Sequence, residues 1–179
     1  MRKVLAVLSL LVAPSAAAGD ACHALLPGVL ISQVTERFPS FRLPAVTDNL
    51  AEDVAWSKEQ SGNECLGAAS ADFDGDGTKD WLLGLTAKAG TGSSVIVALT
   101  RGDSWQLHKL AEWPEGRSRL YVGAEKPGTY DSLFDGPYEP GEVSSFVCPH
   151  SVVVFGAAES SGVAYCYKAG KWQHTWISD

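Results

Sequence analysis

Apolar residues recur at helical spacing near the beginning of the chain, over residues 27–38. The residues on the shared face are Leu30, Ile31, Val34 and Phe38. Pro27 suits the first turn of a helix and Pro39 ends the pattern, so the segment is predicted to form one amphipathic helix.

A second helix is predicted from Asn49 to about Gln60. Asn49 and Glu52 have the spacing of a capping box, in which each side chain accepts a hydrogen bond from the other residue's backbone N–H. Leu50 and Val54 lie one turn apart and share a face. The two segments together predict a helical N-terminal part of the fold.

After Cys65 the pattern changes to short runs rich in Val, Leu, Trp and Tyr, separated by Gly, Asp and Ser. Such runs are typical of antiparallel strands joined by hairpins. The first series of predicted strands is Trp81–Thr86, Ser94–Arg101 and Trp105–Leu110, with a turn at Gly102-Asp103. The second series is Val152–Phe155, Val163–Lys168 and Lys171–Ile177, with a turn at Ala169-Gly170.

The two series predict two three-stranded β-meanders. Trp172-Gln173 in the last strand of the second series repeats Trp105-Gln106 in the first, 67 residues earlier. This favours two degenerate copies of one unit, and coincidence between common hairpin sequences is the alternative. With the helical segment, the pattern predicts an α+β fold, mainly antiparallel β, in a single domain over residues 19–179.

Between the meanders, residues 114–149 show no strong period and are rich in Gly and Pro. A segment this long without structure of its own is unusual in a compact domain unless it is functional. Four of its aromatic residues lie near acidic residues, namely Tyr121, Tyr130, Phe134 and Tyr138. Two interpretations stay open, a binding face and a lid over the core.

Composition excludes some classes of partner. The chain has 179 residues, of which 45% are hydrophobic and 20% charged, as in ordinary globular proteins. Without its first 18 residues it has 12 basic and 21 acidic residues, a formal charge of −9. This excess of acid argues against nucleic acid and against an anionic membrane surface as partners.

Residues 1–18 have the organisation of a secretory signal peptide. Arg2 and Lys3 precede an apolar run from Val4 to Val12, and Ala16-Ala17-Ala18 forms a cleavage site. The run is shorter than the roughly 20 residues that span a bilayer, so no membrane span is expected. A periplasmic or secreted protein is therefore predicted.

All four cysteines follow this leader, and an even number in an oxidising compartment predicts two disulfides. Cys148 and Cys166 flank a predicted hairpin, which favours their pairing and leaves Cys22 to pair with Cys65. Cys148-Pro149-His150 has the appearance of half a zinc site, but no second ligand pair at zinc spacing accompanies it.

The most informative segment is the acidic loop, Asp72 to Asp80. Its four carboxylates repel one another and oppose a compact turn unless a cation neutralises them. Calcium takes roughly six to eight oxygen ligands, and alternate positions of a tight loop can point such ligands inward. The predicted ligands are Asp72, Asp74, Asp76, the backbone carbonyl of Thr78, and Asp80.

The acidic loop differs from an EF-hand, because its twelfth position is Leu83 rather than Glu and a strand is predicted to follow. It resembles the calcium loop of FG-GAP and VCBS-type repeats, in which Asp-x-Asp-Gly-Asp-Gly-x-x-Asp leads into an apolar strand. The resemblance covers about residues 66–110 and implies one calcium site, which we expect to be structural. Magnesium fits less well because it demands a stricter octahedron. A pair of Asp-Gly turns with solvated carboxylates is the alternative.

A shorter string, Ser161-Gly162-Val163-Ala164-Tyr165, resembles the Ser-Gly-x-x-Tyr signature of periplasmic lysozyme inhibitors. A Ser-Gly turn before a strand with an inward-facing Tyr is the alternative interpretation of these five residues.

No nucleophile motif such as Gly-x-Ser-x-Gly is present, so no catalysis is expected. His108 follows its Trp-Gln pair by two positions, whereas His174 follows its own pair by one. Because side chains alternate along a strand, the two histidines are predicted to lie on opposite faces.

We therefore expect an exported, calcium-binding module that is not an enzyme and whose partner is a protein or an envelope polysaccharide. Its candidate contact residues are Tyr121, Tyr130, Phe134, Tyr138, Ser161 and Tyr165. One alternative is a periplasmic inhibitor or immunity protein against a peptidoglycan-cleaving enzyme, a lysozyme or an amidase. A hydrolase acting on envelope polymers is the third hypothesis.

Overall fold

The computed structural model describes residues 19–113 and 120–178, so the predicted leader of residues 1–18 lies outside the described residues. The helices are α1 (Ala21–Leu25), α2 (Gly28–Arg37), the 3-10 helix η1 (Val46–Asp48) and α3 (Ala51–Ser61). The strands are β1 (Phe41–Arg42), β2 (Ala68–Ala71), β3 (Asp80–Ala87), β4 (Ser93–Arg101), β5 (Ser104–Trp113), β6 (Leu120–Glu125), β7 (Gly128–Asp131), β8 (Ser145–Cys148), β9 (Val152–Ala157), β10 (Gly162–Lys168) and β11 (Lys171–Ser178).

The strands form two main sheets and one small one. The first sheet has the order β1-β3-β4-β5, with β2 also paired to β3. The second sheet has the order β11-β10-β9-β6, and β7 and β8 form an outer hairpin. All the strand pairs in these sheets are antiparallel, which confirms the predicted fold class.

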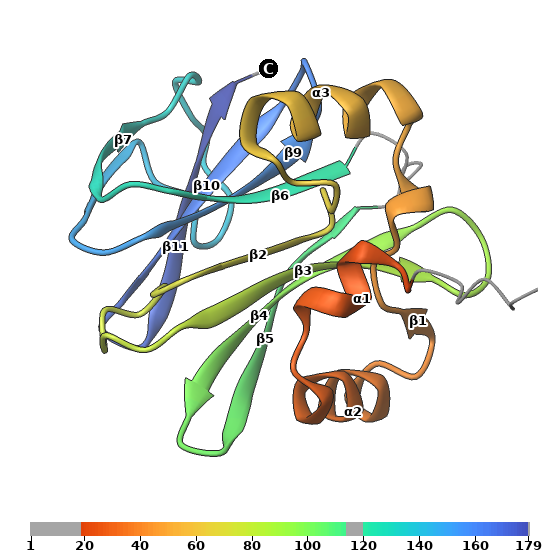
Figure 1. The fold of residues 1–179 in the computed structure, drawn as a ribbon. Helices are drawn as coiled ribbons and strands as arrows, with labels where there is room; N and C mark the ends of the chain where they lie inside the picture. The colour runs from red at the N-terminus through yellow and green to blue at the C-terminus, as the bar shows by residue number, and fades with distance from the viewer. Residues whose placement is uncertain (1–18, 114–119, 179) are drawn as a thin grey trace, which may run out of the picture.

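The elements stack in layers, each joined to the next by buried side chains. Leu82, Val95 and Val97 of the first sheet meet Val153 and Phe155 of the second in an inter-sheet core. The opposite face of the first sheet packs against α1 and α2, and the opposite face of the second packs against β8. Figure 1 shows α1 and α2 on the side of β3, β4 and β5 that faces away from β9, β10 and β11.

The helix predicted over residues 27–38 is confirmed as α2. Pro27 is its N-cap and Phe38 its C-cap, while Leu30 and Val34 are buried against the first sheet. These two residues lie one turn apart, so they face the sheet together. The apolar periodicity of this segment was therefore sufficient to place the helix.

The second predicted helix is present as α3, but its predicted capping box is wrong. Leu50 is the N-cap and makes no side-chain capping bond. Asn49 is instead buried, and its Nδ2 donates to the Leu120 carbonyl at 2.8 Å. The Asn49 side chain, which was predicted to cap the helix, is thus bonded to a carbonyl that is distant in the sequence.

Both predicted meanders are confirmed, as β3-β4-β5 and β9-β10-β11. They belong to two sheets packed face to face, rather than to one sheet. The two Trp-Gln pairs are not structurally equivalent, because Trp105 packs on the helix side of the first sheet and Trp172 packs in the inter-sheet core. The repeated dipeptide therefore does not mark a repeated position.

The prediction that residues 114–149 lack structure is wrong for the described part. Strand β6 completes the second sheet beside β9, and β7 pairs with β8 in the outer hairpin. Leu120 and Val122 alternate with more exposed residues along β6, so their side chains enter the inter-sheet core. Residues 132–144, between β7 and β8, remain a loop, and we call them the aromatic loop.

Both predicted disulfides are confirmed. Cys22 joins Cys65 across 43 residues, and Cys148 joins Cys166 across 18. The first bond ties α1 to the segment before β2, and the second ties the outer hairpin to β10. Two disulfides are typical of proteins from oxidising compartments.

Candidate metal site

The acidic loop connects β2 to β3, two antiparallel neighbours. Its carboxylates organise its own backbone. Asp72 accepts hydrogen bonds from the N–H groups of Gly75, at 2.7 Å, and Gly77, at 2.9 Å. Both glycines have positive φ, 79° and 82°, a conformation that favours glycine. The Asp-Gly pattern therefore produces a turn that is closed by the Asp72 carboxylate on its inner side.

Asp80 closes the loop from the first position of β3 and is fully buried. Its two oxygens accept hydrogen bonds from the N–H groups of Phe73, at 2.8 Å, and Thr100, at 2.7 Å. Burial is the main reason that the pKa of Asp80 is raised above its ordinary value of 3.8, and the charges of Asp74 and Asp76 add to the rise. A cation close to this carboxylate would oppose both effects.

The loop brings three of the five predicted ligands together. Oxygen atoms of Asp72, Asp74 and Asp80 all lie within 4.8 Å of one another. Asp76 is outside this group, and its carboxylate accepts a hydrogen bond from the N–H of Thr78 at 2.7 Å. Thr78 lies on the exposed side of the loop.

Arg101, the last residue of β4, supplies a positive charge to the loop. Its Nη2 lies 2.7 Å from Oδ2 of Asp74, and its Nη1 lies 3.4 Å from Oδ2 of Asp76. The hydrogen bond that Arg101 donates to the Asp74 carboxylate is the main reason that the pKa of Arg101 is raised. The guanidinium thus neutralises part of the carboxylate charge and occupies one oxygen of Asp74.

The acidic loop also contacts the second sheet. The N–H of Ser151 donates to the carbonyl of Asp72 at 3.2 Å. A Cβ built on Gly75 would lie 3.0 Å from the His150 ring, and Nε2 of that ring lies 2.8 Å from the Tyr167 carbonyl oxygen. The loop therefore lies at a junction where the first sheet meets the start of β9 and the end of β10, as Figure 1 shows.

The same junction contains a second group of metal-ligand residue types, Cys148, His150 and Cys166. The two cysteines are joined by a disulfide, so neither sulfur is available as a thiolate ligand. The acidic loop is therefore the better candidate for a metal.

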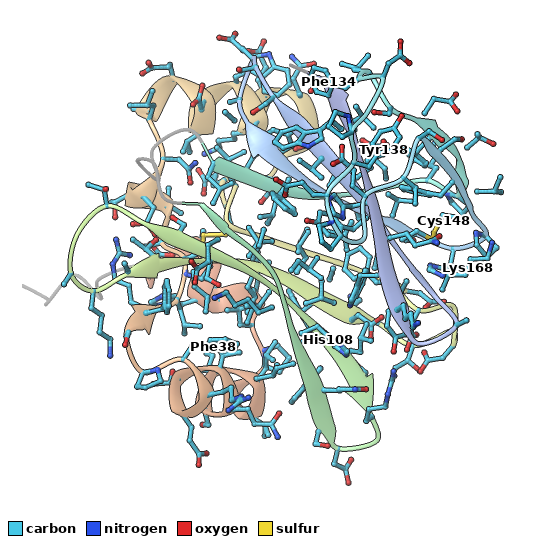
Figure 2. The ribbon with its side chains drawn as sticks, turned by 180° about the vertical axis from the view of Figure 1, so that it is seen from behind. Phe38, His108, Phe134, Tyr138, Cys148 and Lys168 are labelled. Atoms are coloured by element: carbon cyan, nitrogen blue, oxygen red, sulfur yellow. A yellow bond between two sulfur atoms is a disulfide. The ribbon has the colours of Figure 1, made fainter. Side chains whose placement is uncertain are left out.

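Two of the candidate contact residues, Phe134 and Tyr138, lie on the aromatic loop and are exposed. Phe134 is 45% exposed and Tyr138 is 40% exposed. Phe134 meets Trp176 edge-on, and the hydroxyl of Tyr138 donates to the Phe134 carbonyl at 3.1 Å. Figure 2 shows the two side chains close together at one end of the molecule.

Tyr121 and Tyr130 support the fold beneath this loop. Tyr130 stacks on Phe146 with a centroid distance of 5.5 Å, and its hydroxyl donates to the Lys126 carbonyl. Tyr121 packs beside the core of the outer hairpin, and burial raises the pKa of its hydroxyl. Neither is among the exposed large apolar residues.

Ser161 and Tyr165 do not form a common surface. Ser161 lies in the β9–β10 turn, where its carbonyl accepts a hydrogen bond from the N–H of Ala157 at 2.9 Å. Tyr165 is only 8% exposed and stacks on Phe155 and His174. Burial raises its pKa to about 12. This arrangement agrees with a turn followed by a strand with an inward tyrosine.

The two strand histidines both face the inter-sheet core, so the prediction of opposite faces is wrong. His108 meets the rings of Tyr167 and Trp172 edge-on, and His174 stacks on Tyr165 at 4.6 Å. Burial is the main reason that the pKa of each histidine is lowered. Trp105 faces the helices, so His108, three positions later, faces the inter-sheet core. Trp172 faces that core itself, so His174, two positions later, faces it too.

Arg101 and His150 are among the contacts of the acidic loop that the sequence did not identify. Arg101 is separated from Asp74 along the chain by the whole β3–β4 hairpin, so only the pairing of β3 with β4 brings them together. The sequence contains one indication of this contact: Arg101 ends the predicted strand that pairs with the strand following Asp80. For His150 there was none, because its contact depends on how the two sheets pack.

Comparison with protein families, with curated proteins and with solved structures finds no significant match. Among the described residues, no helix is both long enough and apolar enough to cross a membrane.

Proposed function

We propose that this chain is an exported, calcium-stabilised binding module that acts by binding rather than by catalysis. The observation that carries the proposal is the convergence of the Asp72, Asp74 and Asp80 carboxylates within 4.8 Å. Three hard oxygen donors suit calcium. The loop also resembles the FG-GAP and VCBS-type calcium loop, and the two disulfides support a periplasmic or secreted location.

Asp72, Asp74 and Asp80 would hold the ion, and Asp76 and the Thr78 carbonyl are the remaining candidates. Each oxygen of Asp80 already accepts one hydrogen bond, but a carboxylate oxygen has two acceptor sites. Arg101 competes with the ion for Asp74. The Arg101 guanidinium balances only part of the negative charge of the loop carboxylates, and calcium would balance the rest. An ion that neutralises the loop in this way would have a structural role.

The packing of reactive residue types supports a binding role. All four cysteines are in disulfides. His108 and His174 are packed among aromatic rings, and Nε2 of His150 lies against the Tyr167 carbonyl oxygen. These side chains therefore have structural contacts in the described part of the chain, whereas acyl transfer requires a nucleophile beside an available base.

Calorimetric titration with calcium tests the metal site. The double variant Asp74→Ala/Asp76→Ala should lose at least about tenfold in affinity, because it removes two carboxylates from the loop. Asp103→Ala is the matched control, since Asp103 is an exposed acid in the β4–β5 turn, close to Arg101 along the chain. Equal affinity in the double variant and the unaltered protein would contradict the assignment.

We further propose that the partner binds at the aromatic loop. Leu133, Phe134 and Tyr138 are exposed there, and the acids of this part of the chain are Asp131, Asp135, Glu139 and Glu142. No basic residue occurs between Lys126 and His150. Exposed aromatic groups surrounded by negative charge suit a protein with a basic surface.

A pull-down from envelope extract, with captured proteins identified by mass spectrometry, tests this face. Phe134→Ala/Tyr138→Ala should lose a partner that the unaltered protein retains. Trp56→Ala is the control, because Trp56 is 66% exposed on α3, outside the aromatic loop. Retention of the same partner by the double variant would contradict binding at the aromatic loop. Adding chelator shows whether binding depends on calcium.

A further inference from the structure

A groove of about 460 Å³ lies between α2 and β5. Its lining residues are Gln33, Glu36, Arg37, Trp105 and Leu107. The three α2 residues lie three and four positions apart and therefore share one face of the helix. Trp105 and Leu107 lie two positions apart on β5 and therefore share one face of the strand. The volume is within the range of small-molecule binding sites.

The groove is held in shape by a contact across it. Oε1 of Gln33 accepts a hydrogen bond from the backbone N–H of Trp105 at 3.1 Å. Trp105 and Leu107 also pack partly into the core beneath α2. The hydrogen bond thus fixes the Trp105 backbone, and the apolar contacts hold its indole, so the side chain needs little ordering on binding.

The polar groups of the groove are uncommitted. Nε1 of Trp105 is enclosed and has no hydrogen-bond partner among the described residues. Within the same part of the chain, no partner is found for the Nε2 group of Gln33, the carboxylate of Glu36 or the guanidinium of Arg37. The indole N–H has no surface open to the groove, so the polar groups that a ligand can reach there are the Gln33 amide, the Glu36 carboxylate and the Arg37 guanidinium.

The chemistry of the lining selects a class of ligand. The charges of Glu36 and Arg37 cancel, so a strongly charged ligand gains little there. An aromatic ring offers an apolar platform, while an amide, a carboxylate and a guanidinium offer both donors and acceptors. A pyranose ring has the matching form, with one apolar C–H face and hydroxyl groups around its edge. We propose that this groove binds a pyranose unit of a polysaccharide.

This site is independent of the acidic loop and of the aromatic loop. None of its lining residues belongs to either. Figure 2 places Phe38, at the end of α2, at the opposite end of the molecule from Phe134 and Tyr138. A bound glycan would therefore leave the aromatic loop free for a protein partner.

Two-dimensional NMR of the 15N-labelled, oxidised protein tests the proposal. The chain has six tryptophans, so its indole N–H signals are few, and a Trp105→Leu variant identifies the one from Trp105. The probes are the tetramers of N-acetylglucosamine and of glucose, with sorbitol as a hydroxyl-rich compound that has no rigid apolar face. Either sugar should shift the Trp105 indole signal and the amide signals of residues 33–37, while sorbitol should not.

Trp105→Leu keeps an apolar side chain on β5 and should weaken sugar binding at least about tenfold. Arg37→Ala, on the exposed face of α2, should weaken it less. Trp56→Leu removes an exposed tryptophan elsewhere and should leave binding unchanged. The proposal is overturned if neither sugar shifts these signals at about 10 mM, a concentration that detects even millimolar affinity. It is also overturned if sorbitol acts like the sugars, or if Trp105→Leu and Trp56→Leu have equal effects.

Discussion

Asp80 shows how one side chain connects the acidic loop to the first sheet. It is fully buried, yet its two oxygens hold the backbone of two segments, one in the loop and one at the end of β4. A carboxylate can accept both hydrogen bonds, whereas an amide can accept on its oxygen side only. The aspartate is therefore needed for the geometry of the loop, whether or not an ion is bound.

Asp80→Asn should destabilise the protein by about 1–3 kcal/mol in EDTA, where metal binding does not contribute. The expected cause is a buried N–H, from Phe73 or Thr100, that faces an amide donor instead of an acceptor. Urea denaturation measures the loss, and Asp103→Asn is the control on an exposed acid. Unchanged or increased stability of Asp80→Asn would mean that relief of charge repulsion outweighs the lost hydrogen bond.

Tyr165 should make the fold sensitive to alkali. Its pKa is about 12 in the folded protein against an ordinary 10.0, so the folded state holds this proton more tightly. The corresponding stability, up to about 3 kcal/mol, is fully present below pH 10 and is lost as the pH rises toward 12. Chemical denaturation at successive pH values should show this loss, and Tyr165→Phe should show less of it. Identical pH profiles would argue against a buried Tyr165.

At the scale of elements, the sequence predicted the helices and hairpins whose positions are determined by interactions between residues close together along the chain. Helical spacing placed α2, and the turns at Gly102-Asp103 and Ala169-Gly170 placed two hairpins. Strand β6 was missed because Gly123 and the prolines nearby resemble a loop, although Leu120 and Val122 alternate as a strand requires. The capping box failed because a distant carbonyl holds Asn49.

The β9–β10 hairpin provides a test at this scale. A Cβ on Gly156 would lie 1.8 Å from the Ser161 carbonyl oxygen and 2.8 Å from the Gly162 Cα, both of them backbone atoms. Gly156→Ala should therefore destabilise the protein by about 1–3 kcal/mol or more, through displacement of the hairpin backbone. Gly123→Ala is the control in the neighbouring strand β6, where a Cβ would meet nothing within 4 Å. Equal thermal stability of the two variants would contradict the close approach.

At the scale of the whole molecule, the acidic loop lies where the two sheets meet. It continues directly from β2 into β3, and Asp72 and Gly75 contact Ser151 and His150 at the start of β9. The sequence predicted the loop and its carboxylates, because their spacing is local. It did not predict the two separate sheets, Arg101 as a counter-ion or His150 as a neighbour, because these depend on tertiary packing.

The central claim is that an ion bound by the acidic loop stabilises this junction, and thermal unfolding of the oxidised protein tests it most directly. If calcium is present at about 100 times its Kd, it should stabilise the folded state by about 2.7 kcal/mol. For a domain of this size, the melting temperature in millimolar calcium should then exceed that in EDTA by about 5–10 °C. The Asp74→Ala/Asp76→Ala variant should lose this difference. Equal melting temperatures of the unaltered protein in calcium and in EDTA would contradict the claim.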